Sequence, residues 1–172
     1  MNWIEHEVAE LVRMAETPLY SLLSWMKREL GLRLTIESSL EIARSMDDHR
    51  HLVLWRVRHG QRERVDVFPS IPELARDYWR LAAGEDYDPL GYSVSLAKDI
   101  SLDDPPDWSA DFDFEAETVE LRSNGPGIEE ILEQLRPWQP DVTIRVVQER
   151  VEGQSVLWRG TLAIGHAPDT PS

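Results

Sequence analysis

The chain has 172 residues, 41% of them apolar and 29% charged, which is the balance of a folded protein that can bury a core of its own. It contains no cysteine, so disulfides, thiolate metal sites and cysteine nucleophiles are all excluded. Its net charge of -14 disfavours non-specific binding to nucleic acid. No apolar run is long enough to cross a bilayer, and the acidic first ten residues do not fit a secretory signal.

Residues 1–47 are predicted to form a helical region. Apolar residues recur at spacings of three and four from Trp3 to Ala15, and again from Leu19 to Leu30. Pro18 separates the two runs, and Gly31 is a stop signal for the second.

A third, short helix is predicted to begin at Ser38, because Glu41 stands three residues later and completes a capping box. Its apolar side would hold Leu40, Ala43 and Met46. We interpret the three helices either as a subdomain folded onto the rest of the chain or as an arm that reaches a neighbouring subunit.

Near Asp47 the spacing of apolar residues changes from helical to alternating, which predicts a β-hairpin. Its first strand covers Leu52 to Arg58, and its return strand covers Val65 to Phe68. The polar turn between them is centred on residues 59–61. One face of the first strand would carry Val53, Trp55 and Val57.

A fourth helix is predicted to open at Ser70, with Glu73 in a second capping box, and to end at Gly84. Its buried side would be formed by five residues at helical spacing: Ile71, Leu74, Ala75, Tyr78 and Trp79. A short strand is predicted from Tyr92 to Leu96.

An acidic segment follows from Asp99 to Glu120, with nine carboxylates and no basic residue. We expect a loop around Pro105 and Pro106, followed by one strand over roughly Phe112 to Leu121. The aspartates of the loop lack the spacing of an EF-hand. We therefore interpret the segment as a solvated or interfacial acidic surface.

The last part of the chain is predicted to hold a helix and a closing hairpin. Four apolar residues mark the helix: Ile128, Ile131, Leu132 and Leu135. The hairpin begins with alternating apolar residues at Val142, turns at residues 152–153 and returns from Val156 to Ile164.

Together these elements predict an α+β protein. It would have a helical N-terminal region over residues 1–47 and a β-rich domain, built of hairpins or barrel-like, with inserted helices over residues 48–167. Residues 168–172 would form a loose C-terminal tail.

No residue pattern predicts catalysis, a cofactor or a metal. His49, His51 and His59 lie close in sequence, but the surrounding arginines oppose a cation, so we interpret them as part of a solvated hairpin. The stretch from Asn124 to Gly127 precedes a helix without the Gly-Lys-Ser/Thr ending of a phosphate-binding loop. We therefore expect a protein that is not an enzyme and has no catalytic, cofactor-binding or metal-binding residues.

Two oppositely charged segments are the candidate interaction sites. The predicted hairpin is rich in arginine, whose guanidinium group pairs with carboxylates and stacks on aromatic rings. The acidic segment includes a tryptophan, a residue type enriched at the anchoring points of interfaces. The interface candidates are Arg56, Arg58, Arg62, Arg64, Asp103, Asp104, Asp107 and Trp108.

Three pieces of sequence carry a family resemblance. A short helix at residues 39–44 leads to a Leu-Val-Leu-Trp strand at residues 52–55. A strand at residues 119–124 ends in Ser-Asn, and a glycine-containing turn and a helix follow at residues 127–132. The closing hairpin, over residues 142–160, ends on a tryptophan-x-glycine strand.

This order of elements, over about residues 39–165, resembles the minor tail protein L and related distal-tail or baseplate-hub proteins of long-tailed bacteriophages. The resemblance implies structural work in the virion, after assembly in the host cytoplasm, as part of a ring or trimer at the tail tip. Its partners would be other tail or baseplate proteins and copies of itself, without nucleic acid or a membrane span. Protein L has a cysteine-rich C-terminal part that this chain lacks, so a tail-completion or adaptor protein fits as well.

Two other functions stay open. A small acidic inhibitor, such as a toxin immunity protein or an anti-defence protein, fits the net charge of -14 and would be cytoplasmic. Secretion chaperones are also small, acidic and mixed α/β proteins. Neighbouring genes can distinguish these functions. A gene for a tail tube or tape measure protein would support the tail function, and a toxin gene would support the immunity function.

Overall fold

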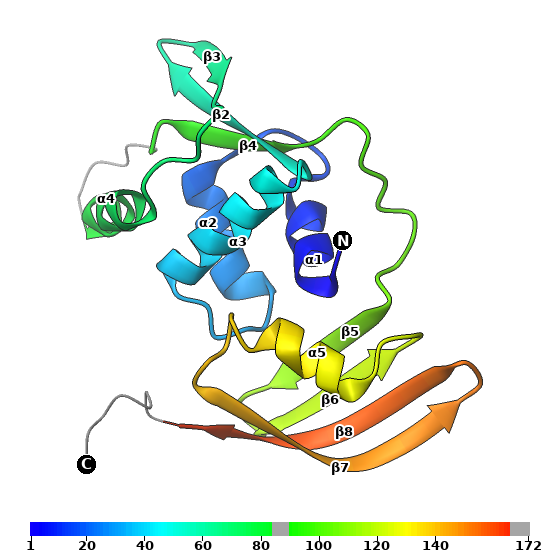
Figure 1. Cartoon of the computed structure of the whole chain (residues 1–172). Coiled ribbons are helices and arrows are strands. Elements are labelled where there is room, and N and C mark those ends of the chain that lie inside the picture. The colour runs from blue at the N-terminus through cyan, green and yellow to red at the C-terminus, as the bar shows by residue number, and fades with distance from the viewer. Residues whose placement is uncertain (84–89, 166–172) are drawn as a thin grey trace. The chain divides into compact units, whose positions relative to one another are not determined.

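The computed structural model describes residues 1–83 and 90–165 of the chain. Within these residues, five helices and two antiparallel four-stranded sheets confirm the predicted α+β fold (Figure 1). The chain divides into two compact units. We call residues 4–30 and 34–104 the N-terminal unit, and residues 1–3, 31–33 and 105–165 the C-terminal unit.

This division differs from the predicted one at residue 47, because the helices before that residue share a unit with the first sheet. The main crossing from one unit to the other falls between Asp104 and Pro105. The predicted tail over residues 168–172 and the predicted helix stop at Gly84 lie outside the described residues.

The N-terminal unit begins with three helices, as the apolar spacing predicts: α1 (Trp3–Val12), α2 (Leu19–Glu29) and α3 (Ile36–Asp48). They bury most of the predicted apolar side chains together with the inner face of the first sheet, but Ala15, at the end of the first predicted run, lies beyond α1 and is exposed. The largest fully buried side chains of this core are Ile4, Leu19, Leu22, Leu23, Met26, Ile36, Leu40, Ile42, Met46 and Leu54.

Helix α3 starts earlier than predicted. Its N-cap is Thr35, whose side chain accepts from the backbone N–H of Ser38, while the Ser38 hydroxyl accepts from the Thr35 N–H at 2.8 Å. Ser38 is therefore the third residue of the helix and not its cap, so the predicted box with Glu41 is wrong. The pairs Thr35–Ser38 and Ser38–Glu41 each place a possible cap residue three positions before a polar partner, so the sequence alone is compatible with either.

The first sheet has the strand order β1-β4-β2-β3, with β1 (Thr17–Pro18), β4 (Tyr92–Leu96), β2 (Leu52–Arg58) and β3 (Gln61–Arg64). Strands β2 and β4 lie where the sequence predicts them. The return strand of the hairpin does not, since it covers Gln61–Arg64 and not Val65 to Phe68. All four residues of β3 are exposed and polar, so the strand carries no apolar alternation that could mark it.

Helix α4 (Ile71–Ala83) also belongs to the N-terminal unit. Its buried residues include Leu74, Ala75 and Tyr78, as predicted. Trp79, predicted on the same side, is 49% exposed, and the Lys27 ammonium lies 5.2 Å from its ring centroid. An indole at the edge of a helix's apolar face can have one side in water. The spacing of apolar residues in the sequence does not show this.

The C-terminal unit holds the second sheet, in the order β5-β6-β8-β7, and helix α5 (Ile128–Leu135) (Figure 1). The strands are β5 (Trp108–Asp113), β6 (Thr118–Ser123), β7 (Val142–Glu152) and β8 (Ser155–Ile164). The helix and the closing hairpin β7–β8 confirm the prediction. The core of this unit consists of Trp108, Val119, Leu121, Ile131, Leu135, Leu157, Trp158 and Leu162.

The acidic segment forms two strands where one was predicted. A turn over residues 114–117 separates β5 from β6. The Asp113 carboxylate accepts the Ala116 N–H at 2.9 Å, and Glu117 takes a left-handed backbone with φ 56°. Because the turn contains neither glycine nor proline, the sequence shows no break within the predicted strand. Over the described residues, no helix has the length and apolar character needed to cross a membrane.

Candidate functional site

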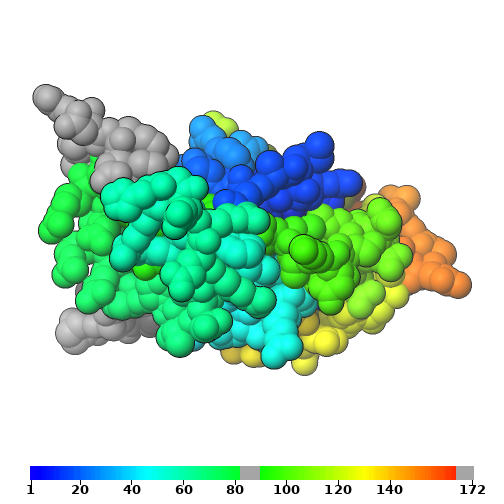
Figure 2. Space-filling model, turned by 90° about the horizontal axis from the view of Figure 1, so that it is seen from above, coloured from blue at the N-terminus to red at the C-terminus, as the bar shows by residue number. Residues whose placement is uncertain are grey.

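The outer face of the first sheet carries a groove with a volume of about 660 Å³. We call it the Trp55 groove, after the indole of β2 that lies in its lining. The β2–β3 hairpin is at the surface in Figure 2, in the blue-green part of the colour scale. The charged side chains of the lining are Glu16, Arg50, Arg62, Arg64, Lys98 and Asp99, and all belong to the N-terminal unit.

Strand register places the groove residues on one face. Trp55 is the direct partner of Arg64 on β3 and of Ser93 on β4. Directly paired residues of an antiparallel sheet point to the same side, while Leu54, next along β2, is 1% exposed on the other side. The predicted shared face of Val53, Trp55 and Val57 is therefore the outer face of the sheet.

The turn of the hairpin fixes this register. His59 and Gly60 both have positive φ, 51° and 77°, as in the two-residue type I′ turn whose twist matches that of paired strands. Strand β3 therefore starts directly at Gln61, opposite Arg58. A longer turn would shift the register, and a shift of one residue would move the β3 arginines to the other face.

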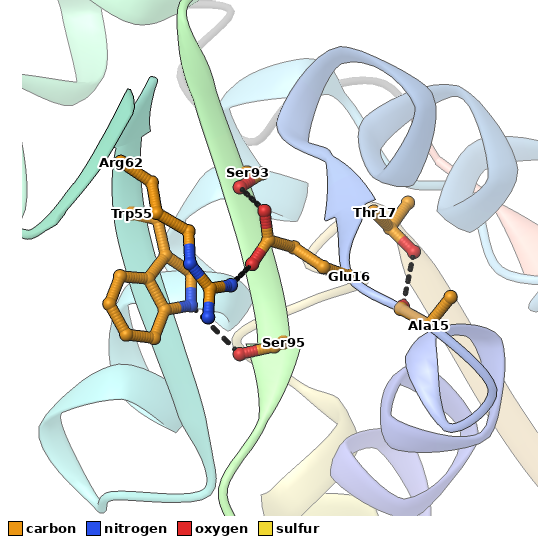
Figure 3. Close-up of polar contacts among 7 residues, drawn as sticks. All are labelled: Ala15, Glu16, Thr17, Trp55, Arg62, Ser93 and Ser95. Atoms are coloured by element: carbon orange, nitrogen blue, oxygen red, sulfur yellow. Dashed lines mark hydrogen bonds and ion pairs between the residues drawn. The ribbon is translucent and has the colours of Figure 1, made fainter. Parts of the chain in front are cut away.

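Arg62 is held in place by two neighbours (Figure 3). Its guanidinium carbon lies 4.3 Å from the ring centroid of Trp55, and Nη1 pairs with one oxygen of Glu16. The other oxygen of Glu16 accepts from the Ser93 hydroxyl at 2.8 Å. The Trp55 indole N–H donates to the Ser95 hydroxyl at 2.9 Å. The stacking on Trp55 and the ion pair with Glu16 together fix the Arg62 guanidinium in one orientation, although the side chain is partly exposed.

The remaining cations of the groove have looser surroundings. Among the described residues, Arg50, Arg64 and Lys98 make no ion pair within 4.0 Å. Burial raises the pKa of the Asp47 carboxyl, the charge of Asp48 raises it further, and the Arg64 guanidinium opposes both. Four cationic side chains thus meet two carboxylates in the groove of a chain with a net charge of -14.

The predicted arginine candidates divide into two groups. Arg62 and Arg64 line the Trp55 groove. Arg56 lies elsewhere, with its guanidinium carbon 4.6 Å from the Tyr92 ring centroid and a buried Nε without a hydrogen-bond partner in the described chain. Arg58, at the end of β2, is exposed.

The predicted acidic candidates do not form one site. Asp103 and Asp104 are exposed at the end of the N-terminal unit, and Asp107 is exposed in the other unit. Trp108 is only 3% exposed, and its indole N–H donates to the Gln134 side chain at 3.0 Å. Its indole is therefore part of a core, with little surface left for a partner.

Sequence reasoning missed Glu16 and Lys98 as members of the groove, and it included Asp99 only as the start of the acidic segment and Arg50 only as one cation of the charged hairpin region. They come from the ends of elements that are distant in sequence, and no local spacing connects them. Pairing of β1 with β4 brings Glu16 beside Ser93, but the two-residue strand β1 has too few residues for a period.

One group of three side chains among the described residues has the donor atoms and spacing for a metal ion: Glu5, His49 and His51. All three belong to the N-terminal unit. No family model, curated protein or solved structure matches the chain. Its function therefore has to be inferred from the chemistry of its own residues.

Proposed function

We propose that the chain is a non-enzymatic binding component of a multi-subunit assembly, and that its Trp55 groove receives an acidic segment of a neighbouring subunit. The resemblance over residues 39–165 suggests which assembly this is: the tail tip or baseplate of a bacteriophage or of a related tail-like particle. The neighbour would be another tail protein or a second copy of this chain.

The observation that supports this proposal most is the sign of the groove's charge. The chain as a whole carries -14, so a partner with carboxylates is repelled from most of its surface. At the groove, four cations stand against two carboxylates, and Glu16 already has partners for both of its oxygens. A local reversal of sign favours one docking orientation over others and speeds the encounter.

The side chains of the groove suit carboxylates of a protein segment. Guanidinium groups bind carboxylates through two parallel hydrogen bonds, and the half-buried Trp55 adds apolar contact area beside them. Arg64 and Lys98 are exposed and make no ion pair among the described residues, whereas Arg62 is held by Trp55 and Glu16. Asp103 and Asp104 are exposed, so a second copy of this chain would offer a segment with carboxylates.

Charge reversal in the groove tests the proposal in cells that carry the gene. The variant Arg64→Glu with Lys98→Glu changes two groove cations that make no ion pair among the described residues. We expect the share of the chain that sediments with assembled particles to fall at least about tenfold, equivalent to about 1.4 kcal/mol. Immunoblots across a density gradient measure that share.

The matched control is Arg76→Glu with Arg80→Glu. Both arginines are exposed on α4 of the same unit, and their reversal makes the same change in net charge outside the groove. The control should sediment like the unmodified chain. Equal incorporation of the groove variant, with circular dichroism unchanged, would refute the groove as a docking site, and an unmodified chain found only as free protein would refute the assembly.

A second function, that of a small acidic inhibitor, is favoured by one other observation. The hairpin β5–β6 of the C-terminal unit exposes a row of carboxylates: Asp111, Asp113, Glu115, Glu117 and Glu120. Such a row suits a basic partner, as an immunity protein requires. Co-purification of a basic toxin in place of tail proteins, lost when these carboxylates are changed to amides, would favour this function.

A further inference from the structure

We propose that Glu5, His49 and His51 form a mononuclear binding site for a divalent transition metal of the zinc type, with three protein ligands and one open position for water. The site lies within the N-terminal unit and does not depend on the Trp55 groove. It differs from the histidine cluster that sequence reasoning weighed and rejected, because the carboxylate of α1 takes the place of His59.

The end of helix α3 positions the two histidines. Arg50 has a left-handed backbone with φ 61°, the His51 N–H donates to the Met46 carbonyl at 2.8 Å, and the Arg50 N–H donates to the Asp47 carbonyl at 3.0 Å. This is the Schellman arrangement, here without the usual glycine. The His51 carbonyl also accepts the Ala97 N–H at 3.0 Å, so the backbone that carries the rings is tied to the first sheet.

The donor atoms are close to the spacing that a metal requires. Nδ1 of His51 lies 2.9 Å from Oε2 of Glu5, and Nδ1 of His49 lies 3.9 Å from the same oxygen. One donor atom from each of the three residues fits within 4.8 Å of the others. Metal–ligand bonds of about 2.0–2.1 Å in a tetrahedral site put donors roughly 3.3 Å apart, so His49 has to move by about an ångström. Its side chain is 61% exposed and can do so without disturbing the core.

The donor set favours zinc over hard cations. Two imidazoles and one carboxylate are ligands that zinc, nickel and copper accept, whereas calcium and magnesium prefer oxygen alone. The side chains of Glu5 and His51 are 14% and 21% exposed, which gives the ion a sheltered side, while His49 leaves the other side open. An open position on a three-ligand zinc site is normally filled by water.

Two of the arginines that opposed a cation in the sequence are engaged elsewhere. The guanidinium of Arg62 pairs with Glu16, and that of Arg56 lies over Tyr92. Arg50 and Arg64 line the Trp55 groove. The sequence proximity of these cations to the histidines therefore overstates the repulsion that a bound ion would experience.

A simple structural contact would explain only part of the geometry. The hydrogen bond between His51 and Glu5 satisfies both groups without any metal. It gives no role to His49, whose nearest approach to Glu5 is too long for a hydrogen bond. A metal, in contrast, needs all three side chains, and His49 therefore separates the two explanations.

The test is calorimetric titration of the chelator-treated full chain with zinc alone. We expect saturable binding of one ion per chain, and visible absorption from a low-coordinate site when Co²⁺ replaces zinc. His49→Ala and Glu5→Gln should each weaken zinc binding at least about 100-fold, since loss of even an outer-shell partner costs about 10- to 100-fold. Mg²⁺ and Ca²⁺ should give no heat of binding.

The matched control is His59→Asn, which removes an exposed histidine outside the cluster and keeps a residue that tolerates the positive φ of the hairpin turn. This variant should bind zinc within about twofold of the unmodified chain. Wild-type zinc binding by folded His49→Ala, an equal loss in His59→Asn, or the absence of saturable binding would each overturn the proposal. If Glu5→Gln does not fold, zinc binding by the His49→Ala variant alone decides, because His49 is exposed.

Discussion

The two sheets of the chain have the same number of strands and the same antiparallel pairing, yet different contacts hold them. In the first sheet, side chains of distant elements meet on an open face, as where Glu16 joins Arg62 to Ser93. In the second sheet, the longest strands β7 and β8 approach so closely that one position has no room for a side chain. The first sheet thus offers a chemically varied face to ligands, and the second contains a place where backbone approach leaves no room for a side chain.

The closest approach in the second sheet lies at Gly160. A Cβ there would lie 2.6 Å from the Arg145 carbonyl oxygen, beside the bulge between Val146 and Gln148. We expect Gly160→Ala to lower the free energy of unfolding by about 1–3 kcal/mol, because backbone and not a flexible side chain has to move. Urea denaturation followed by circular dichroism measures the change.

Gly125→Ala is the control for this substitution. Gly125 has no atom within 4 Å of its added Cβ and no positive φ, so alanine should be neutral or slightly stabilising there. If both variants unfold at the same urea concentration, the second sheet is not limited by backbone approach and the contrast between the sheets fails.

Matched indole substitutions sharpen the comparison. Trp158 of the second sheet is 5% exposed and donates to the Glu149 carboxylate at 2.8 Å, whereas Trp55 of the first sheet is only half-buried and donates to Ser95. We expect Trp158→Phe to cost about 1–2 kcal/mol and Trp55→Phe about 0.5–1 kcal/mol. Thermal unfolding of the two variants gives the order, and a larger loss at Trp55 would show that the open face carries more of the stability than its exposure indicates.

Prediction from sequence succeeds where burial imposes a period. The helices α1, α2 and α5 and the strand β8 all follow from apolar spacing, whereas β7 forms where its alternation predicts it although none of its residues is buried. It fails for β3, whose residues are all exposed, and for the turn before β6, where Glu117 adopts positive φ without glycine. In both places the chain lacks the composition signal on which the prediction depends.

The candidate sites were less predictable than the fold, for a different reason. The sequence points to Arg62 and Arg64, because they are neighbours in one charged hairpin. It does not reveal that Glu16 joins them, or that Glu5 meets His49 and His51, because such contacts depend on the pairing and packing of elements far apart in the chain. Only the folded structure brings these groups together.

The smallest expected effect concerns the ion pair of the open face. The side chains of Arg62 and Glu16 are 55% and 29% exposed, so water and salt weaken their attraction. A double-mutant cycle with Glu16→Gln and Arg62→Gln should give a coupling free energy of about 0–1 kcal/mol, which decreases as salt is added. Equilibrium urea unfolding of the four proteins supplies the cycle.

A small coupling has a specific meaning for the first sheet. Glu16 would then act mainly by holding the Arg62 guanidinium over Trp55, and the Trp55 groove would be a surface arranged for a ligand at little gain in stability. A coupling well above 1 kcal/mol, unaffected by salt, would instead make the pair a stabilising element like the buried contacts of the second sheet. Glu16→Gln would in that case destabilise the unit itself, and any loss of partner binding in this variant would follow from unfolding and not from a misplaced guanidinium.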